Sequence, residues 1–428
     1  MKHLFSTLIK SNFVRNVAVV GGGIALAQAI TLAFTPFLTR LYGPESYGIA
    51  AAFAAVISII SPMATMGYAN AIVLPEKDDD AAAVARLSIL CAFGILPFTI
   101  LIIYLAKPQL AQWTGLQSAP NLLYLIPVSL LISAFLSVAN QSAIRKGLFK
   151  AKARAYVEST LFTNIGKLGG GLSLPSGMML IILTQLGQLL NFVMQMLRVP
   201  RTGVLKPVNW FGVKGALSAA NSQRDFAIYR MPQSMIRALA MGMPVVVLTA
   251  LYGPSEAGQY SLTLLILGAP VMLLGDSVGE VFYPKITRAI TGKTGDASAL
   301  VLKAVAVLGV VALATFGPII ILGDRVLPLI FGSEWEKAGL YSQWVAVWMI
   351  AMLASRPAIA AMPALKLQSA LLVYEVLVTG ARFLALYMGS KLSDDLFSIA
   401  LFSIVNVLGY IALTVVVFIN IYRARNRV

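Results

Sequence analysis

Nine ionisable side chains lie within stretches of this sequence that are otherwise apolar. A charge in hydrocarbon is costly unless it is paired or hydrated, so these residues are the first candidates for binding or ion coupling. They are Glu158, Lys167, Arg230, Arg237, Asp276, Glu280, Arg356, Glu375 and Arg382. The single histidine, His3, and the single cysteine, Cys91, argue against a histidine metal site, a Ser-His-Asp triad and an internal disulfide. We therefore expect no catalytic residue, no metal and no cofactor.

Three pairs of these charges fall at similar depths on neighbouring antiparallel segments, counting ~1.5 Å of helix per residue. The pairs are Arg230 with Glu280, Arg237 with Asp276, and Arg356 with Glu375. Glu158 occupies the position in its half of the chain that Glu375 occupies in the other half. These residues are interpreted as ion pairs that lock or gate the structure, or as coupling groups that contact a ligand.

Lys167 and Arg382 have no obvious partner and lie in corresponding apolar segments. Because an unpaired cation facing lipid would be too costly, we expect a hydrated cavity that Lys167, Arg382 and Arg237 face. Arg40 would line its outer mouth or extend to the lipid headgroups. Such a cavity suits an anionic substrate, for example a lipid-linked phosphate.

The composition explains why these charges must be held by membrane helices. Of 428 residues, 58% are hydrophobic and only 12% are charged, against about 45–50% and 25% in soluble domains. This excludes a soluble enzyme, a disordered chain and a nucleic-acid-binding protein. Apolar runs of roughly 20 residues can cross a bilayer only as helices. We count about twelve, near 17–40, 46–73, 82–106, 120–144, 154–173, 177–199, 226–250, 257–283, 298–322, 338–362, 368–388 and 396–421.

Most of the 33 Lys and Arg residues fall in alternate connections when both termini are placed in the cytoplasm. The predicted fold class is all-α, a polytopic membrane protein of about 12 transmembrane helices in two repeated six-helix bundles. The predicted parts are a cytoplasmic amphipathic segment, an N-terminal six-helix bundle, a basic cytoplasmic linker, a C-terminal six-helix bundle and a basic cytoplasmic tail. They span residues 1–16, 17–199, 200–225, 226–421 and 422–428, respectively.

A short motif recurs in the two halves. Leu41-Tyr42-Gly43-Pro44, followed by Gly48, returns as Leu251-Tyr252-Gly253-Pro254, followed by Gly258. Proline fixes φ and glycine permits positive φ, so each copy predicts a tight turn. Six spans per half make the repeats parallel, and two like bundles around a shared cleft suggest alternating access.

Further residues carry a family resemblance. They are Arg15-Asn16, the stretch from Gly21-Gly22-Gly23 to Gln28, Pro36, Leu38 to Pro44 with Gly48, and Phe331-Gly332 with Trp335 and Ala338. This pattern resembles the polysaccharide transporter family, the Wzx-like O-antigen and exopolysaccharide flippases of the multidrug/oligosaccharidyl-lipid/polysaccharide exporter superfamily. The resemblance implies a bacterial inner-membrane flippase that moves undecaprenyl-pyrophosphate-linked oligosaccharide repeat units for O-antigen, capsule or exopolysaccharide synthesis.

The resemblance implies no enzyme activity. Expected partners are the lipid-linked oligosaccharide, membrane lipids, and a polysaccharide polymerase and chain-length protein, with no nucleic acid. Two alternatives stay open within transport: an ion-coupled multidrug exporter using Asp276, Glu280 and Glu375, and a flippase for a peptidoglycan precursor. A membrane-embedded polymerase or ligase is the alternative of another class, although the outer connections are short for a catalytic loop.

Overall fold

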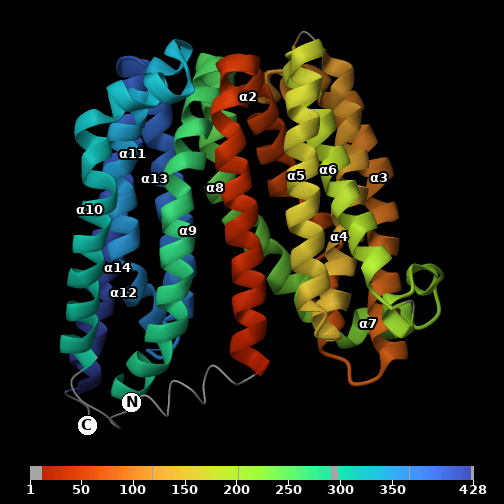
Figure 1. Ribbon diagram of the computed structural model, residues 1–428. Helices are drawn as coiled ribbons and strands as arrows, with labels where there is room; N and C mark the ends of the chain where they lie inside the picture. The colour runs from red at the N-terminus through yellow and green to blue at the C-terminus, as the bar shows by residue number, and fades with distance from the viewer. Residues whose placement is uncertain (1–11, 118, 201, 291–296, 366, 426–428) are drawn as a thin grey trace. The chain divides into compact units, whose positions relative to one another are not determined.

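The computed structural model describes residues 12–117, 119–200, 202–290, 297–365 and 367–425. Within these residues all regular structure is helical (Figure 1), so the all-α prediction is confirmed. The chain divides into two compact units. The first unit comprises Met1–Tyr42 and Ile49–Gly242, and the second comprises Gly43–Gly48 and Met243–Val428.

The first unit is built from long helices that cross it repeatedly. They are α2 (Asn12–Ala64), α3 (Asp78–Thr114), α4 (Leu125–Arg145), α5 (Phe149–Ser173) and α6 (Gly177–Arg198), with the first part of α8 (Met231–Tyr252). Short helices η1 (Tyr68–Val73), η2 (Pro120–Tyr124), η3 (Gly203–Leu205), η4 (Pro207–Trp210), α7 (Ala216–Ser222) and η5 (Phe226–Arg230) complete it. Helices α5 and α6 pack side by side (Figure 1).

The second unit contains the rest of α8 and the later helices. They are α9 (Pro254–Ile290), α10 (Ala297–Phe331), η6 (Ser333–Trp335), α11 (Glu336–Ala354), α12 (Arg356–Ala361), α13 (Gln368–Leu392) and α14 (Asp395–Arg425). Helix α10 packs along α11, and α13 packs along α14 (Figure 1).

The helices fit a membrane. In the described part of the chain, eight are long and apolar enough to cross one, and every apolar run found in the sequence is mainly helical. One of the eight, Val19–Ala64 in α2, covers most of two predicted spans, which are separated at Gly43 by non-helical backbone angles (φ 69°, ψ 171°). A multi-pass helical membrane protein is confirmed, while twelve spans in two six-helix bundles stay a prediction.

Residues 202–225, most of the predicted basic linker, fold onto the first unit. Trp210 is fully buried, and its indole Nε1 donates a hydrogen bond to the carbonyl of Val204 (2.7 Å). Its ring lies beside Phe135 and Phe192, and α7 packs against α3. This segment is therefore part of a core. Most of the predicted amphipathic segment, 1–11, and the end of the tail, 426–428, lie outside the described residues.

The two copies of the repeated motif adopt the predicted turn. Gly43 and Gly253 both have positive φ, 69° and 104°. The tyrosine of each copy contacts the backbone of a later helix or connection in its own half. The Tyr42 hydroxyl donates to the carbonyl of Lys167 (2.6 Å), and that of Tyr252 donates to the carbonyl of Asp394 (3.1 Å).

Within the second unit the two copies meet. A Cβ atom at Gly48 would collide with the carbonyl oxygen of Pro254, and a Cβ atom at Gly258 would collide with that of Pro44. The two contacts are reciprocal. Both positions require glycine, because the two backbones approach too closely to leave room for a Cβ atom.

Candidate functional sites

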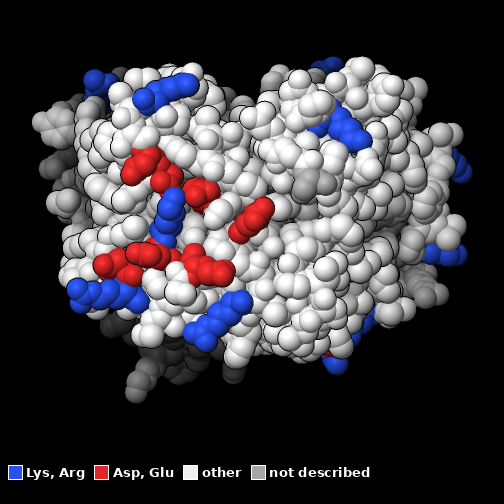
Figure 2. All heavy atoms as spheres, turned by 90° about the horizontal axis from the view of Figure 1, so that it is seen from above, with Lys and Arg blue, Asp and Glu red and all other residues white. Residues whose placement is uncertain are grey.

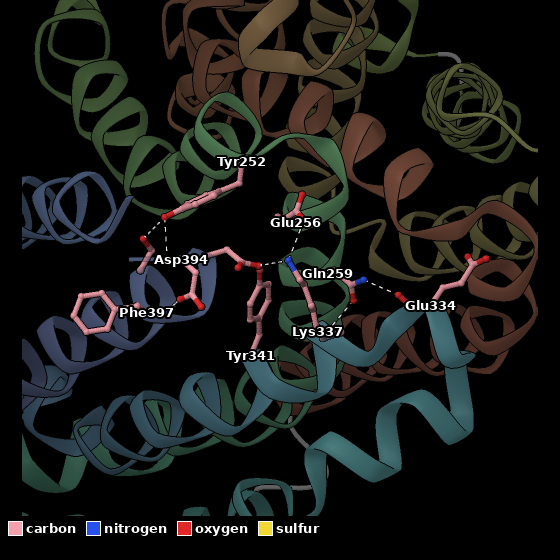
Figure 3. A network of polar contacts seen from close by, with 11 residues as sticks. Tyr252, Glu256, Gln259, Glu334, Lys337, Tyr341, Asp394 and Phe397 are labelled. Carbon is pink, nitrogen blue, oxygen red and sulfur yellow. Dashed lines mark hydrogen bonds and ion pairs between the residues drawn. The ribbon is translucent and has the colours of Figure 1, made fainter. Parts of the chain in front are cut away.

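Lys337 is the centre of a polar network at one end of the second unit (Figure 3). Its ammonium nitrogen lies 3.2 Å from Oε1 of Glu256 and 2.7 Å from Oδ2 of Asp395. The Tyr341 hydroxyl donates to the same Asp395 oxygen. Glu256 and Asp395 lie in the first turns of α9 and α14, where the helix dipole favours negative charge. Lys337 thus joins the starts of three helices.

Neighbouring hydrogen bonds extend this network. The Gln259 side chain donates to the carbonyl of Glu334 (2.7 Å) and accepts from the backbone N–H of Ala338 (2.9 Å). On the other side, Asp394 caps α14 by accepting from the backbone N–H of Phe397 (2.8 Å). Seen from this end of the helices, acidic side chains gather in one area around basic ones (Figure 2). Because the carboxylates of Glu256 and Asp395 already have partners, this network is suited to holding helix ends together.

A second ionic cluster lies in the first unit, where α3 begins. Asp78, the first residue of α3, pairs with Arg145 (3.3 Å) and Lys146 (2.5 Å). The Arg145 guanidinium also donates to the carbonyls of Pro75 and Glu76. An adjoining pocket of about 430 Å³ is lined by the start of α3 and by α7. The acidic run at 78–80 therefore has the helix-start role that its position suggests.

Glu158 is held in ion pairs between α5 and α6. It accepts from Arg154 (2.7 Å) and from Arg198. Because Glu158 pairs with one arginine on each helix, the simplest interpretation is that it locks α5 to α6.

The predicted cavity cations have different surroundings in the two units. Lys167 on α5 is half-buried, and the described residues supply no ion-pair or hydrogen-bond partner for its ammonium group. Arg237 on α8 and Arg40 on α2 are exposed. Arg382 on α13 is only 8% exposed, and its Nε atom has no hydrogen-bond partner in the described part of the chain. The first three belong to the first unit, and Arg382 belongs to the second.

Two expected pairs cannot be placed, because the side chains of Asp276 and Glu280 lie outside the described residues. Their predicted partner Arg230 is exposed and donates to Gln233 (3.4 Å). No ion pair within 4.0 Å joins Arg356 and Glu375, although both side chains are described, and their proposed role stays a prediction. Helix α11 ends at Ala354 and a new helix begins at Arg356, so depth counted along one straight helix does not place this side chain.

Sequence reasoning missed the ion pairs that Asp395 and Asp78 form with Lys337 and Lys146, because these charges lie at the ends of apolar runs. The sequence signal that could have found Asp395 and Asp78 is the position of an acidic residue at a helix start. In the same described part of the chain, no group of three or more His, Cys, Asp or Glu side chains is arranged to hold a metal ion.

Residues 37–339, most of the chain, match the family described as polysaccharide biosynthesis protein. The chain belongs to this family. A curated relative, the succinoglycan biosynthesis transport protein ExoT of Rhizobium meliloti (strain 1021), is 24% identical over 329 residues. That match covers 74% of this chain and 61% of ExoT, so the chain spans about three fifths of its relative's length.

Solved structures show which fold this polysaccharide biosynthesis family member has. An inward-facing multidrug resistance MATE family transporter of the MOP superfamily aligns with a TM-score of 0.72 at 14% identity, covering 96% of this chain and 99% of that chain. The lipid II flippase MurJ, in an inward closed conformation, aligns with 0.73 at 13% identity, covering 93% and 87%. The fold is therefore MATE-like.

Proposed function

We propose that this protein is a flippase that translocates undecaprenyl-pyrophosphate-linked oligosaccharide repeat units across the bacterial inner membrane. The observation that carries the proposal, beside family membership, is a cation without a carboxylate partner on a long helix in each unit, where the sequence predicts a membrane span. These cations are Lys167 on α5 and Arg382 on α13. Charges of this kind are retained in membrane helices where they serve a substrate or ion, and a diphosphate is a substrate group that they would attract.

The proposed mechanism is alternating access between two repeated six-helix bundles, with both termini in the cytoplasm. Lys167, Arg237 and Arg382 would attract the diphosphate, and Arg40 would lie at the outer mouth. Support comes from the family match and from the similarity to ExoT, a transport protein for succinoglycan biosynthesis. A polysaccharide polymerase and a chain-length protein would use the delivered repeat units.

An ion-coupled multidrug exporter is the second candidate, because the MATE transporter aligns as well as MurJ does. Glu375 favours it, since this carboxylate has no ion pair within 4.0 Å among the described residues. Deleting the gene separates the two candidates. Loss of drug resistance with normal polysaccharide export would support the exporter and contradict the flippase.

Replacing the cavity cations tests the proposed site. In a deletion strain, we expect Lys167→Ala, Arg237→Ala or Arg382→Ala to restore polysaccharide export at least tenfold less well than the wild-type gene. This corresponds to about 1.4 kcal/mol or more of lost interaction with the diphosphate. Arg237→Lys and Arg382→Lys should retain part of the activity, because the charge remains.

The matched control is Lys391→Ala, which removes an exposed cation from the same helix as Arg382. Membrane abundance of every variant is measured by immunoblot, and export is measured as polysaccharide per cell. Full export by all three alanine variants would show that these cations do not bind the substrate.

A further inference from the structure

The segment that precedes and begins α7 has apolar side chains on both of its faces. Its inner face packs on the first unit through Val204, Leu205 and Trp210, which are buried. Four large apolar side chains on its outer face are 51% to 78% exposed. They are Val208, Phe211, Val213 and Leu217. Apolar area in water is unfavourable, and exposed apolar residues this close together indicate a binding surface.

Positive charge accompanies these apolar side chains. Lys206 and Lys214 lie among them in the sequence, and both side chains are exposed. In the part of the chain that the structure describes, neither ammonium group forms an ion pair within 4.0 Å. Residues 202–224 include three basic residues and no acidic one. We call the exposed group the linker surface, and its members are Lys206, Val208, Phe211, Val213, Lys214 and Leu217.

Contacts with α3 show at which level of the helices the linker surface lies. A Cβ atom at Gly203 would lie 2.6 Å from Oδ2 of Asp78, the first residue of α3. The guanidinium of Arg86 donates to the carbonyl of Lys214 (2.9 Å). Arg86 lies about 12 Å farther along α3, at ~1.5 Å per residue. Because α3 is long and apolar enough to cross a membrane, the linker surface lies where a membrane span begins.

The chain also ties the linker surface to membrane helices at both ends. Two of the helices that are long and apolar enough to cross a membrane flank it, Gly177–Arg198 and Phe226–Tyr252. Helix α7 packs on α3, and the loop before α7 projects to the side of these helices (Figure 1). A segment held at this level meets lipid headgroups and the upper part of the acyl chains.

We propose that the linker surface inserts its apolar side chains into the membrane interface and binds anionic phospholipid through Lys206 and Lys214. Exposed lysines beside exposed apolar residues are typical of segments that lie in the interface. The lysines are attracted to negatively charged headgroups, and the segment has no acidic residue to oppose this. Lipid is favoured over a protein partner because membrane helices adjoin the surface at both ends. The proposal goes beyond the proposed function, because it does not depend on the transported substrate.

The first experiment locates the linker surface relative to the bilayer. Leu217→Cys is introduced into a Cys91→Ser background, labelled with a nitroxide, and reconstituted as the full-length protein in vesicles of phosphatidylcholine and phosphatidylglycerol. We expect the label to collide more often with oxygen, which concentrates among acyl chains, than with a water-soluble nickel complex. Ser222→Cys is the matched control, because Ser222 is exposed on the same helix and lines a pocket with Asp80. A label there should show the reverse order.

The second experiment measures which lipid contacts the linker surface. A fluorophore attached through Leu217→Cys is quenched in vesicles in which either phosphatidylglycerol or phosphatidylcholine carries brominated chains. We expect stronger quenching by brominated phosphatidylglycerol. Lys206→Gln combined with Lys214→Gln should lower this preference by about fivefold. Lys150→Gln combined with Lys391→Gln removes two exposed cations elsewhere and should leave the preference unchanged.

The outcomes separate a lipid surface from a protein surface. Val213→Cys repeats both measurements if Leu217→Cys does not fold. A water-exposed label at both positions in vesicles would overturn the proposal and leave the linker surface to a protein partner. A label among acyl chains that is quenched equally by both lipids would overturn the assignment to anionic phospholipid.

Discussion

Lys337 contacts two carboxylates from different helices. One of them, Asp395, is only 9% exposed, so removal of Lys337 would leave a buried carboxylate without its cation. The Lys337 side chain is about half exposed (47%), so solvent weakens its part of the interaction. The buried Asp395 carboxylate therefore dominates the effect on stability, because an unpaired buried charge costs more free energy than the ion pair contributes.

We therefore expect Lys337→Met to destabilise the protein by about 1–3 kcal/mol, less than the loss of a fully buried pair. The thermal unfolding midpoint in detergent is the measurement. Adding Asp395→Asn to Lys337→Met should recover part of the loss, because the orphaned charge is gone. Lys391→Met, whose ammonium lies over the ring of Tyr387 at 5.6 Å, serves as the control. An unchanged midpoint for Lys337→Met would contradict a structural role for the network.

At the scale of helices, the reciprocal contact of Gly48 and Gly258 is the feature that most restricts which residue can occupy its positions. A Cβ atom at Gly258 would meet backbone atoms, which cannot move aside as a flexible side chain can. Gly268, on the same helix α9, has open space around its Cβ position. The two glycines therefore form a matched pair for substitution.

Gly258→Ala should cost about 1–3 kcal/mol through overpacking, whereas Gly268→Ala should be neutral or stabilise α9 by about 0.5–1 kcal/mol. Thermal unfolding of the two variants under identical conditions gives the comparison. Equal midpoints would mean that the two motif copies do not approach as closely as described.

The whole chain also shows what its sequence could predict. Composition and apolar run length predicted a multi-pass all-α protein, and Gly43 and Gly253 predicted the turns, because these features are local. The pairing of Lys337 with Asp395 joins residues far apart in the sequence, which periodicity does not reveal. Basic residues around Trp210 predicted a cytoplasmic linker, but the burial of this indole depends on distant residues such as Phe135 and Phe192, which the local sequence does not reveal. Which charges pair depends on helix rotation, which depth matching does not include.

Twelve spans would place the connection at residue 202 in the cytoplasm and residue 393 outside. Cys91 is the only cysteine, so Thr202→Cys and Ser393→Cys can be introduced separately into a Cys91→Ser background. In intact cells, an impermeant maleimide should label position 393, and position 202 only after permeabilisation. Labelling of both positions from the same side would exclude an odd number of spans between them and so contradict the predicted topology.

Translocation of a lipid-linked oligosaccharide is the central claim, and purified protein in liposomes tests it most directly. The substrate is incorporated in both leaflets, and an impermeant glycosidase is added outside. With a flippase, nearly all of the substrate becomes accessible with time, whereas protein-free liposomes stop at about the outer-leaflet share. The account predicts complete access with the wild type and slow access with Arg382→Ala. Access that stops at the outer-leaflet share with folded wild-type protein would contradict it.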